Sequence, residues 1–340
     1  MNKIINLIVA MAALSFCFSC NNEWEDEQFA HYVGFKAPIN SEGCTTVHVR
    51  YNEDGSTVRY QLPLVVSGST IHEGNINAVV EIDSDSLEII NMKNFGARRT
   101  DIWFQNLADN ENQYIEKDRV VTEFPATVKI PAGESTALLD IEMDLTGLDQ
   151  TWRWVLPLKV AENQPGYKAN TRKHYNNAML NIVPFNDYSG TYSASTMDGY
   201  ADDGSGNYPL DQAKLVVDSK TFYATGANTA FFYAGPIDHT YKQREEYRVD
   251  VTFEEGGRIY LTADNPALGF SVESASYEKS DVADPLKPYL VRKNTTINAV
   301  YFMTDATNGG EPVKYKFTGA MVMQRTINTQ IPDQDQAIQW

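Results

Sequence analysis

The sequence predicts an all-β protein of two domains, a β-sandwich followed by a β-sandwich or β-barrel. Apolar and polar residues alternate along several runs, among them residues 137–143, 247–253 and 313–323. This period of two is typical of half-buried antiparallel strands. Turn signals separate such runs, for example Glu255-Gly256-Gly257. One short helix is predicted over residues 86–94, with Ser86 as its N-cap.

The first domain is predicted to span residues 29–184. Residues 60–66 resemble residues 154–160, since both runs contain Leu-Pro-Leu. A proline inside a strand lacks the ladder N–H, so Pro63 and Pro157 indicate edge strands or bulges in a sandwich with irregular edges. A further strand is predicted over residues 178–183, where Pro184 would end it.

The second domain is predicted to span residues 185–328, with residues 329–340 as a tail. Turn residues mark the boundary, because Pro-Phe-Asn-Asp-Tyr-Ser-Gly fills residues 184–190. Short strands are then predicted from Thr191 on and near 214–217, 221–225, 230–234, 247–253, 258–262, 295–303 and 313–323. This spacing favours a sandwich or barrel of roughly eight strands.

The N-terminus reads as a bacterial lipoprotein signal over residues 1–20. Lys3 supplies the positive charge, residues 4–18 are apolar, and Ser19 is the small residue before Cys20. The run is too short for a stable membrane span, so we expect cleavage and lipidation of Cys20. The alternative is an ordinary secretory signal that is cut near Ser19. Residues 21–28 are acidic and polar, as in a solvated tether.

Composition limits the classes of binding partner and the possible pairing of the cysteines. The chain has 340 residues, 42% of them hydrophobic, and a net charge of −17. Such a charge argues against nucleic acid and anionic membranes, and suits neutral or cationic ligands. Cys17 would leave with the signal and Cys20 would be acylated, which leaves Cys44 without an intramolecular disulfide. We expect Cys44 to be a small buried or turn residue.

The chain resembles the two-domain surface lipoproteins of gut Bacteroidetes. The resemblance rests on the lipobox, the acidic run after it, the paired Leu-Pro-Leu runs, Ile-Pro-Ala-Gly-Glu at 130–134 and the junction at 184–190. It implies an Ig-like N-terminal domain of unknown function, a type also found before family-18 glycosidases, and an all-β C-terminal domain. It further implies export to the cell surface on the outer membrane, a role in polysaccharide utilisation, and a possible outer-membrane uptake complex as partner.

No catalytic motif is visible in the sequence. The Asp-x-x-Asp-x-Asp-x-Glu run of family-18 glycosidases is absent, as are Gly-x-Ser-x-Gly and His-Glu-x-x-His. The histidines lack ligand spacing, and we expect surface or hydrogen-bonded roles for them; they are His31, His48, His72, His174 and His239. The chain is therefore predicted not to be an enzyme and to need no cofactor.

One loop in the second domain is the predicted ligand site. Residues 198–208 combine carboxylates, glycines and two tyrosines. Tyr200 and Tyr208 would stack on sugar rings, while Asp203 and Asn207 would bond hydroxyls. A calcium site built from Asp198, Asp202 and Asp203 is a weaker alternative, because Ca²⁺ prefers clustered oxygens. A plain polar loop is the remaining interpretation.

The tryptophans offer a second possible platform. Trp103 follows a polar run, but large aromatic residues in β-sandwiches more often fill the core, and we expect this of Trp103, Trp152 and Trp154. The predicted function is non-catalytic binding of an extracellular glycan or polysaccharide by a cell-surface lipoprotein. A structural or adhesion component of an outer-membrane complex is the first alternative. A glycoside hydrolase with an unseen carboxylate pair is the second.

Overall fold

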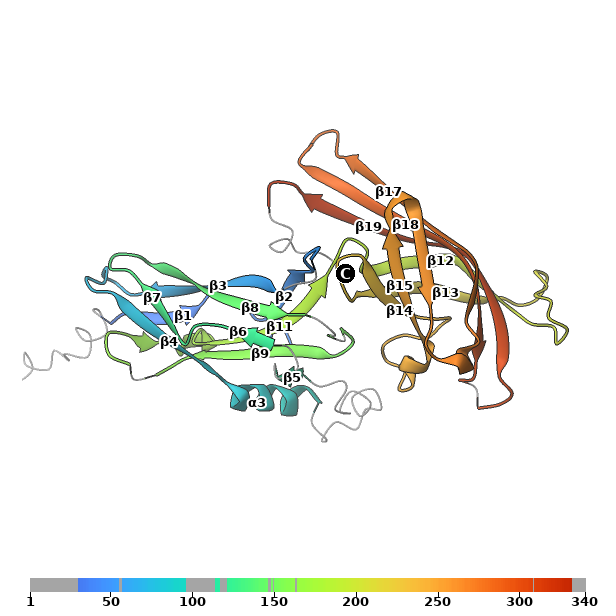
Figure 1. Cartoon of the computed structure of the whole chain (residues 1–340). Helices are drawn as coiled ribbons and strands as arrows, with labels where there is room; N and C mark the ends of the chain where they lie inside the picture. The colour runs from blue at the N-terminus through green and yellow to red at the C-terminus, as the bar shows by residue number, and fades with distance from the viewer. Residues whose placement is uncertain are drawn as a thin grey trace, which may run out of the picture.

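The computed structural model describes residues 30–331, except 55–56, 96–113, 117–120, 146–147, 149, 163 and 308. Two β-rich domains lie end to end (Figure 1). The all-β prediction is confirmed. The predicted signal with Cys20, the acidic tether, Trp103 and residues 332–340 of the predicted tail lie outside the described residues. None of the described helices has the length and apolarity that a membrane span requires.

The first domain is a sandwich of two sheets, with the core between them. One sheet comprises, in order, β10 (Lys168–Ala169), β1 (Tyr32–Phe35), β3 (Val58–Ser67), β8 (Thr136–Asp144) and β6 (Val121–Glu123). The other comprises β2 (Thr45–Arg50), β11 (Asn177–Phe185), β9 (Arg153–Val160), β4 (Ile76–Ile82) and β7 (Thr127–Ile130), and β5 (Tyr114–Glu116) pairs with β9. Leu139, Ile141 and Met143 on β8 are fully buried, which confirms the alternation predicted there.

The prediction that Pro63 and Pro157 mark edge strands or bulges is wrong. Pro63 lies in β3 between β1 and β8, and Pro157 lies in β9 between β11 and β4. Each proline instead lies just past the last paired residue of a neighbouring strand, where its carbonyl accepts from Lys36 N (2.8 Å) or Asp83 N (3.1 Å). The missing N–H therefore faces a place where no ladder bond is required.

The predicted helix is present but begins earlier. Helix α3 spans Ser84–Phe95, and Ser86 is not its N-cap. The Asp83 carboxylate accepts a hydrogen bond from Ser86 N (3.4 Å), so Asp83 caps the helix. Leu87 packs from the helix against Cys44, which is fully buried as predicted. Trp154 is buried in the core and stacks on the partly buried Trp152, with ring centroids 5.8 Å apart.

The second domain is a closed barrel of eight antiparallel strands. They are, in order, β12 (Gly190–Ala201), β13 (Leu215–Ala224), β14 (Thr229–Tyr233), β15 (Arg248–Glu254), β16 (Arg258–Thr262), β17 (Ser271–Ala283), β18 (Leu290–Asp305) and β19 (Val313–Asn328). The two runs predicted near 214–217 and 221–225 form one strand, β13. Strand β17 has no predicted counterpart, because along it only Tyr277 is buried and most other residues are polar.

Lys220 is buried inside the barrel where β13 and β14 diverge after pairing at one end. Its Nζ donates to Tyr233 O (2.8 Å) and Ile237 O (2.6 Å) and so bridges the gap between the two strands. Burial lowers the pKa of this amine to about 7, against an opposing effect of the Asp238 charge. A neutral amine still has two N–H donors, enough for both carbonyls.

This buried amine makes barrel stability depend on pH. Between about pH 7 and pH 10 the unfolded chain holds a proton on Lys220 that the folded protein has lost, so stability rises with pH. We expect this group to contribute about 2–4 kcal/mol across that window. Urea unfolding from pH 6.5 to 10 measures it. The pH-dependent gain in unfolding free energy should disappear in Lys220→Met. It should persist in Lys287→Met, because Lys287 is an exposed lysine. Parallel profiles for Lys220→Met and the unsubstituted protein would contradict this.

Candidate ligand-binding site at the mouth of the barrel

The inward-facing rows of β17, β18 and β19 continue past the apolar barrel core into polar residues. Register partners lie on the same face of a sheet, and on this face Asp281 pairs with Lys293, which pairs in turn with Arg325. The residues that share this polar face are Lys279 and Asp281 on β17, Lys293 and Thr295 on β18, and Met323, Arg325 and Ile327 on β19. These rows form an overhanging wall at the barrel end that faces the first domain (Figure 1).

The junction between the domains is locked by Asn186, which is almost fully buried. Its side-chain oxygen accepts from Tyr188 N and Ser189 N, both at 2.8 Å. Its amide nitrogen donates to Gly226 O (2.7 Å) and Thr229 O (2.8 Å) in the β13–β14 turn. The side-chain oxygen therefore orders the junction itself, and the side-chain nitrogen ties the junction to the barrel.

The prediction that Pro184 ends the preceding strand is wrong. Strand β11 continues to Phe185 and pairs with β2 through Pro184 and Phe185. Its pairing with β9 on the other side ends at Asn181. Because Phe185 O accepts from Tyr51 N on the β2 side, Pro184 faces the side that β9 has left. The strand therefore carries the chain straight into the barrel.

Tyr188 packs next to the mouth, against the lining residue Lys279. Its ring stacks on Phe253 with centroids 3.9 Å apart, and it meets Tyr277 edge-on at 5.5 Å. The Lys279 Nζ lies 3.9 Å from the centre of the Tyr188 ring, in a cation–π contact. The junction thus places a cluster of aromatic rings beside Lys279.

The first domain supplies one wall through Arg50, the last residue of β2. Arg50 Nη1 lies 2.8 Å from Asp187 Oδ1, and Lys279 Nζ lies 3.5 Å from Asp187 Oδ2. Burial alone would raise the pKa of Asp187, but the Arg50 hydrogen bond and the charges of Arg50, Lys279 and Lys293 lower it. Asp187 therefore stays ionised and joins the two domains across the mouth.

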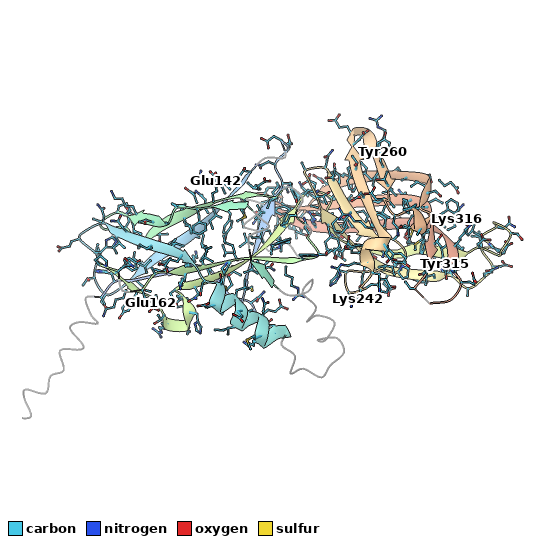
Figure 2. The ribbon with its side chains drawn as sticks, turned by 60° about the horizontal axis from the view of Figure 1, so that its bottom comes forward. Glu142, Glu162, Lys242, Tyr260, Tyr315 and Lys316 are labelled. Carbon is cyan, nitrogen blue, oxygen red and sulfur yellow. The ribbon has the colours of Figure 1, made fainter. Side chains whose placement is uncertain are left out.

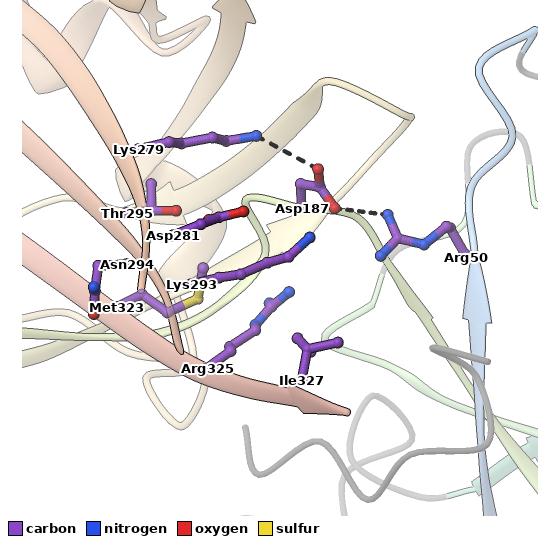
Figure 3. A pocket seen from close by; sticks show the side chains of 10 residues that line it. All are labelled: Arg50, Asp187, Lys279, Asp281, Lys293, Asn294, Thr295, Met323, Arg325 and Ile327. Atoms are coloured by element: carbon purple, nitrogen blue, oxygen red, sulfur yellow. Dashed lines mark hydrogen bonds and ion pairs between the residues drawn. The ribbon is translucent and has the colours of Figure 1, made fainter. Parts of the chain in front are cut away.

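A cavity of about 350 Å³ lies between these walls. Figure 3 shows Lys293 and Arg325 pointing from β18 and β19 toward Arg50. Arg325 is 9% exposed and donates from Nη1 to Asn186 O (3.1 Å). Its charge, after burial, also lowers the pKa of His48 on β2. Four cationic side chains and two carboxylates line the cavity.

This arrangement suits recognition of a polar small molecule. Mouths of β-barrels are frequent ligand sites, and the volume lies at the lower end of the usual ~300–1,000 Å³. Asp281 and Thr295 offer a carboxylate and a hydroxyl, while Met323 and Ile327 offer apolar surface. Among the described residues, no group of three or more His, Cys, Asp or Glu side chains is placed to hold a metal ion.

The loop predicted as the ligand site lies at the opposite end of the barrel, between β12 and β13 (Figure 1). Asp203 Oδ1 accepts from Ser205 N (2.8 Å), and Asn207 Nδ2 donates to Asp203 Oδ2 (3.2 Å). These bonds lower the pKa of Asp203 and hold Asp203 and Asn207 to each other. Both side chains are thus already engaged within their own turn.

The two predicted tyrosines lie near a common neighbour, Lys316 (labelled at the barrel end in Figure 2). Tyr200 is the register partner of Lys316. Tyr208 packs on Phe302 with centroids 5.3 Å apart, and Lys316 Nζ lies 5.4 Å from the same ring. An aromatic patch therefore exists on the outer barrel face, and its third ring, Phe302, was not among the predicted site residues.

The three carboxylates considered for calcium do not gather into a cage. Asp198 forms an ion pair with Lys214 at 2.9 Å. Asp202 Oδ1 accepts from the backbone N–H groups of Gly204 and Gly206, both at 2.8 Å. With Asp203 bound to Asn207, each carboxylate is directed to a protein donor of its own.

The sequence carried one signal for the mouth that the prediction of a loop site overlooked. Beyond the apolar alternation of 313–323, Arg325 and Ile327 keep the same period, and Lys279, Asp281 and Lys293 do so on the neighbouring strands. Alternation that turns from apolar to charged marks inward positions beyond a core. Arg50 gives no such signal, because the fold brings it from a distant segment.

Comparison with known proteins matches both domains. The domain family DUF4973, of unknown function, matches residues 24–165, and a family described only as a "-like, C-terminal" domain matches residues 176–322. No curated protein matches the chain. A multidomain protein including DUF1735 from Bacteroides ovatus has 36% identity and a TM-score of 0.74, covering 91% of this chain and 100% of its own.

Two further solved structures are similar over the same extent. A Bacteroides ovatus protein of unknown function has 37% identity and a TM-score of 0.76, covering 91% of this chain and 100% of its own. An auxiliary nutrient binding protein from Bacteroides thetaiotaomicron has 30% identity and a TM-score of 0.72, covering 90% of this chain and 100% of its own. None of these three is described as an enzyme.

Proposed function

Because this chain belongs to the same family as these Bacteroides proteins, we propose that it binds a carbohydrate nutrient at the barrel mouth without transforming it. The cavity between the domains carries the proposal, since charged, hydroxyl and amide groups converge there. The description of one relative as a nutrient binding protein supports it. Hydroxyl-rich ligands need such a set of fixed donors and acceptors.

Binding without chemistry fits the electrostatics better than hydrolysis does. A glycosidase uses two carboxyl groups, one of them a general acid with a raised pKa. Asp187 is one of the two carboxylates in the cavity, and its pKa is lowered by Arg50 and the lysines around it. An ionised Asp187 cannot be the general acid, and Arg50 and Lys279 already engage the two oxygens that a base or nucleophile would use. The cavity also favours a binding role over a purely structural one.

The proposed setting is the outer face of the outer membrane, with the chain anchored through lipidated Cys20. Strand β1 begins opposite Ser67, at the end of the sandwich away from the barrel (Figure 1). An anchor before β1 would therefore hold the barrel outermost, where polymers arrive. Delivery to an outer-membrane uptake complex is the proposed next step.

A glycan array on the purified protein, followed by calorimetry on any hit, tests the proposal. Asp281→Trp, which places a large ring in the cavity, should weaken binding at least tenfold. Glu278→Trp is the matched control, because Glu278 is an exposed acidic residue on the other face of β17. Absence of binding to every glycan, with normal folding, would refute the proposed function.

The aromatic loop patch is proposed as a second contact for the same ligand. Tyr200→Ala and Tyr208→Ala test it in the same calorimetric assay. Reduced affinity in either variant would support the patch, since aromatic faces pack on sugar rings. Unaltered affinity in both would assign binding to the mouth alone.

The anchor has a separate test in cells. Cys20→Ala should move the protein from the membrane fraction to the soluble fraction, because lipidation at this residue is the proposed attachment. Protease treatment of intact cells should degrade the unsubstituted protein if it faces outward. Membrane retention of Cys20→Ala would contradict the anchor.

A further inference from the structure

We infer that the sugar recognised at the barrel mouth carries a negative charge, as a carboxylate or a sulfate ester. This inference rests on the proposed function and adds the ligand class. It also departs from what net charge suggests, since a chain of −17 suits neutral or cationic ligands. The local charge of the cavity has the opposite sign.

Basic residues outnumber acidic ones in the cavity lining, whereas acidic residues outnumber basic ones in the whole chain. Overall, 28 basic residues face 45 acidic ones, whereas four basic and two acidic residues line this cavity. Asp187 is already engaged by Arg50 and Lys279. Lys293 has no ion pair within the described residues, although Asp281 is its register partner. The cavity is thus net cationic.

The two central cations differ in how they are held. Arg325 is buried and its guanidinium is positioned through Asn186 O, so its charge is fixed in a place of low solvent access. Lys293 reaches into the cavity from the adjacent strand (Figure 3). A planar guanidinium beside an ammonium is suited to a carboxylate or sulfate oxygen pair.

The remaining lining favours a charged sugar over a simple inorganic anion. Asp281 would repel a small multivalent anion, but it can accept from a sugar hydroxyl. Thr295 adds a hydroxyl, and Met323 and Ile327 add apolar surface for the C–H face of a ring. An acidic sugar is the ligand class that matches the cations and these groups together.

Distant charges do not prevent this binding. At physiological ionic strength the Debye length is about 8 Å, so repulsion from acidic residues elsewhere on the protein is largely screened. A contact to the buried Arg325 is screened much less. Charge in the cavity, not net charge, therefore decides which sugar is bound.

Calorimetry with matched ligand pairs tests the inference on the purified protein. The probes are tetragalacturonate and its methyl ester, which lacks the charge, and a sulfated galactan oligosaccharide with its desulfated form. We expect one acidic member to bind at least tenfold tighter than its uncharged counterpart. Preference for tetragalacturonate assigns a carboxylate, and preference for the sulfated galactan assigns a sulfate ester.

Two variants assign that preference to the cavity. Lys293→Gln should lower the affinity for the acidic ligand about tenfold, as expected when a charged hydrogen bond is lost. Lys314 is an exposed lysine on β19 that does not line the cavity, so Lys314→Gln should leave the affinity for the acidic ligand unchanged. Asp281→Asn should strengthen acidic binding severalfold by removing a like charge, a gain that a misfolded variant cannot produce.

The outcomes separate this inference from the proposed function. If neutral glycans bind, Asp281→Trp blocks them, and charge on the sugar has no effect, the inference is wrong while carbohydrate binding at the mouth stands. If neither the probes nor any arrayed glycan binds, both are wrong. Equal affinity of Lys293→Gln and the unsubstituted protein for an acidic ligand would also overturn the inference.

Discussion

Replacing Gly319 by alanine should destabilise the barrel by at least about 3 kcal/mol. Gly319 has φ = +147°, a conformation that other residues rarely adopt. A Cβ atom there would lie 2.0 Å from Thr196 O and 2.8 Å from the Met197 Cα. Both neighbours are backbone atoms of β12, so no side-chain rotation can relieve the overlap. Strand β12 would have to move away from β19.

Urea unfolding followed by far-UV circular dichroism measures this effect, because both domains contribute β-signal. Tryptophan fluorescence reports separately on the first domain through Trp152 and Trp154. Gly310→Ala is the matched control, since nothing lies within 4 Å of its added Cβ and its φ is not positive. Equal stability of the two alanine variants would show that β12 does not approach β19 this closely.

Replacing Asn186 by alanine should cost about 3–5 kcal/mol and loosen the connection between the domains. The substitution removes the partners of two N–H groups, at Tyr188 and Ser189, and of two carbonyls, at Gly226 and Thr229. Unpaired buried polar groups carry the full penalty of lost solvation. Ligand affinity at the mouth should fall as well, because the backbone carbonyl of residue 186, which positions Arg325, would no longer be held in place by the side chain.

The same unfolding assay checks this, with calorimetry for the affinity. Asn298→Ala is the control, because Asn298 is exposed on β18 and should change stability by less than about 0.5 kcal/mol. A small effect of Asn186→Ala, within that of the control, would mean that water replaces the amide and that the junction is not locked by it.

Much of the strand content could be predicted from local pattern alone. Runs such as 248–254 alternate because one face meets the core, and the turn at Glu255-Gly256-Gly257 follows from glycine, which takes positive φ at Gly256. Strand β17 escaped prediction because its inward residues become Lys279 and Asp281 where the core ends. Period-two reasoning that looks for apolar residues misses a strand that lines a polar mouth.

The proline errors have a related physical cause. Sequence reasoning treats a strand as edge or central along its whole length, whereas Pro63, Pro157 and Pro184 each lie where a neighbouring strand stops. The missing proline N–H affects the hydrogen-bond ladder only at the proline itself. The packing of the two sheets decides where a neighbouring strand ends. The sequence of one strand alone does not carry that information.

Local sequence pattern accounts for the all-β character and the alternating faces of the strands, because both depend on residues close together in the chain. The closure of eight strands into a barrel follows from tertiary structure alone, as does the position of Arg50 and Lys279 on either side of Asp187 at its mouth. These residues lie far apart in sequence. Their proximity depends on strand register and on how the junction packs against the barrel. The local charge of the cavity therefore could not be predicted from the amino-acid composition.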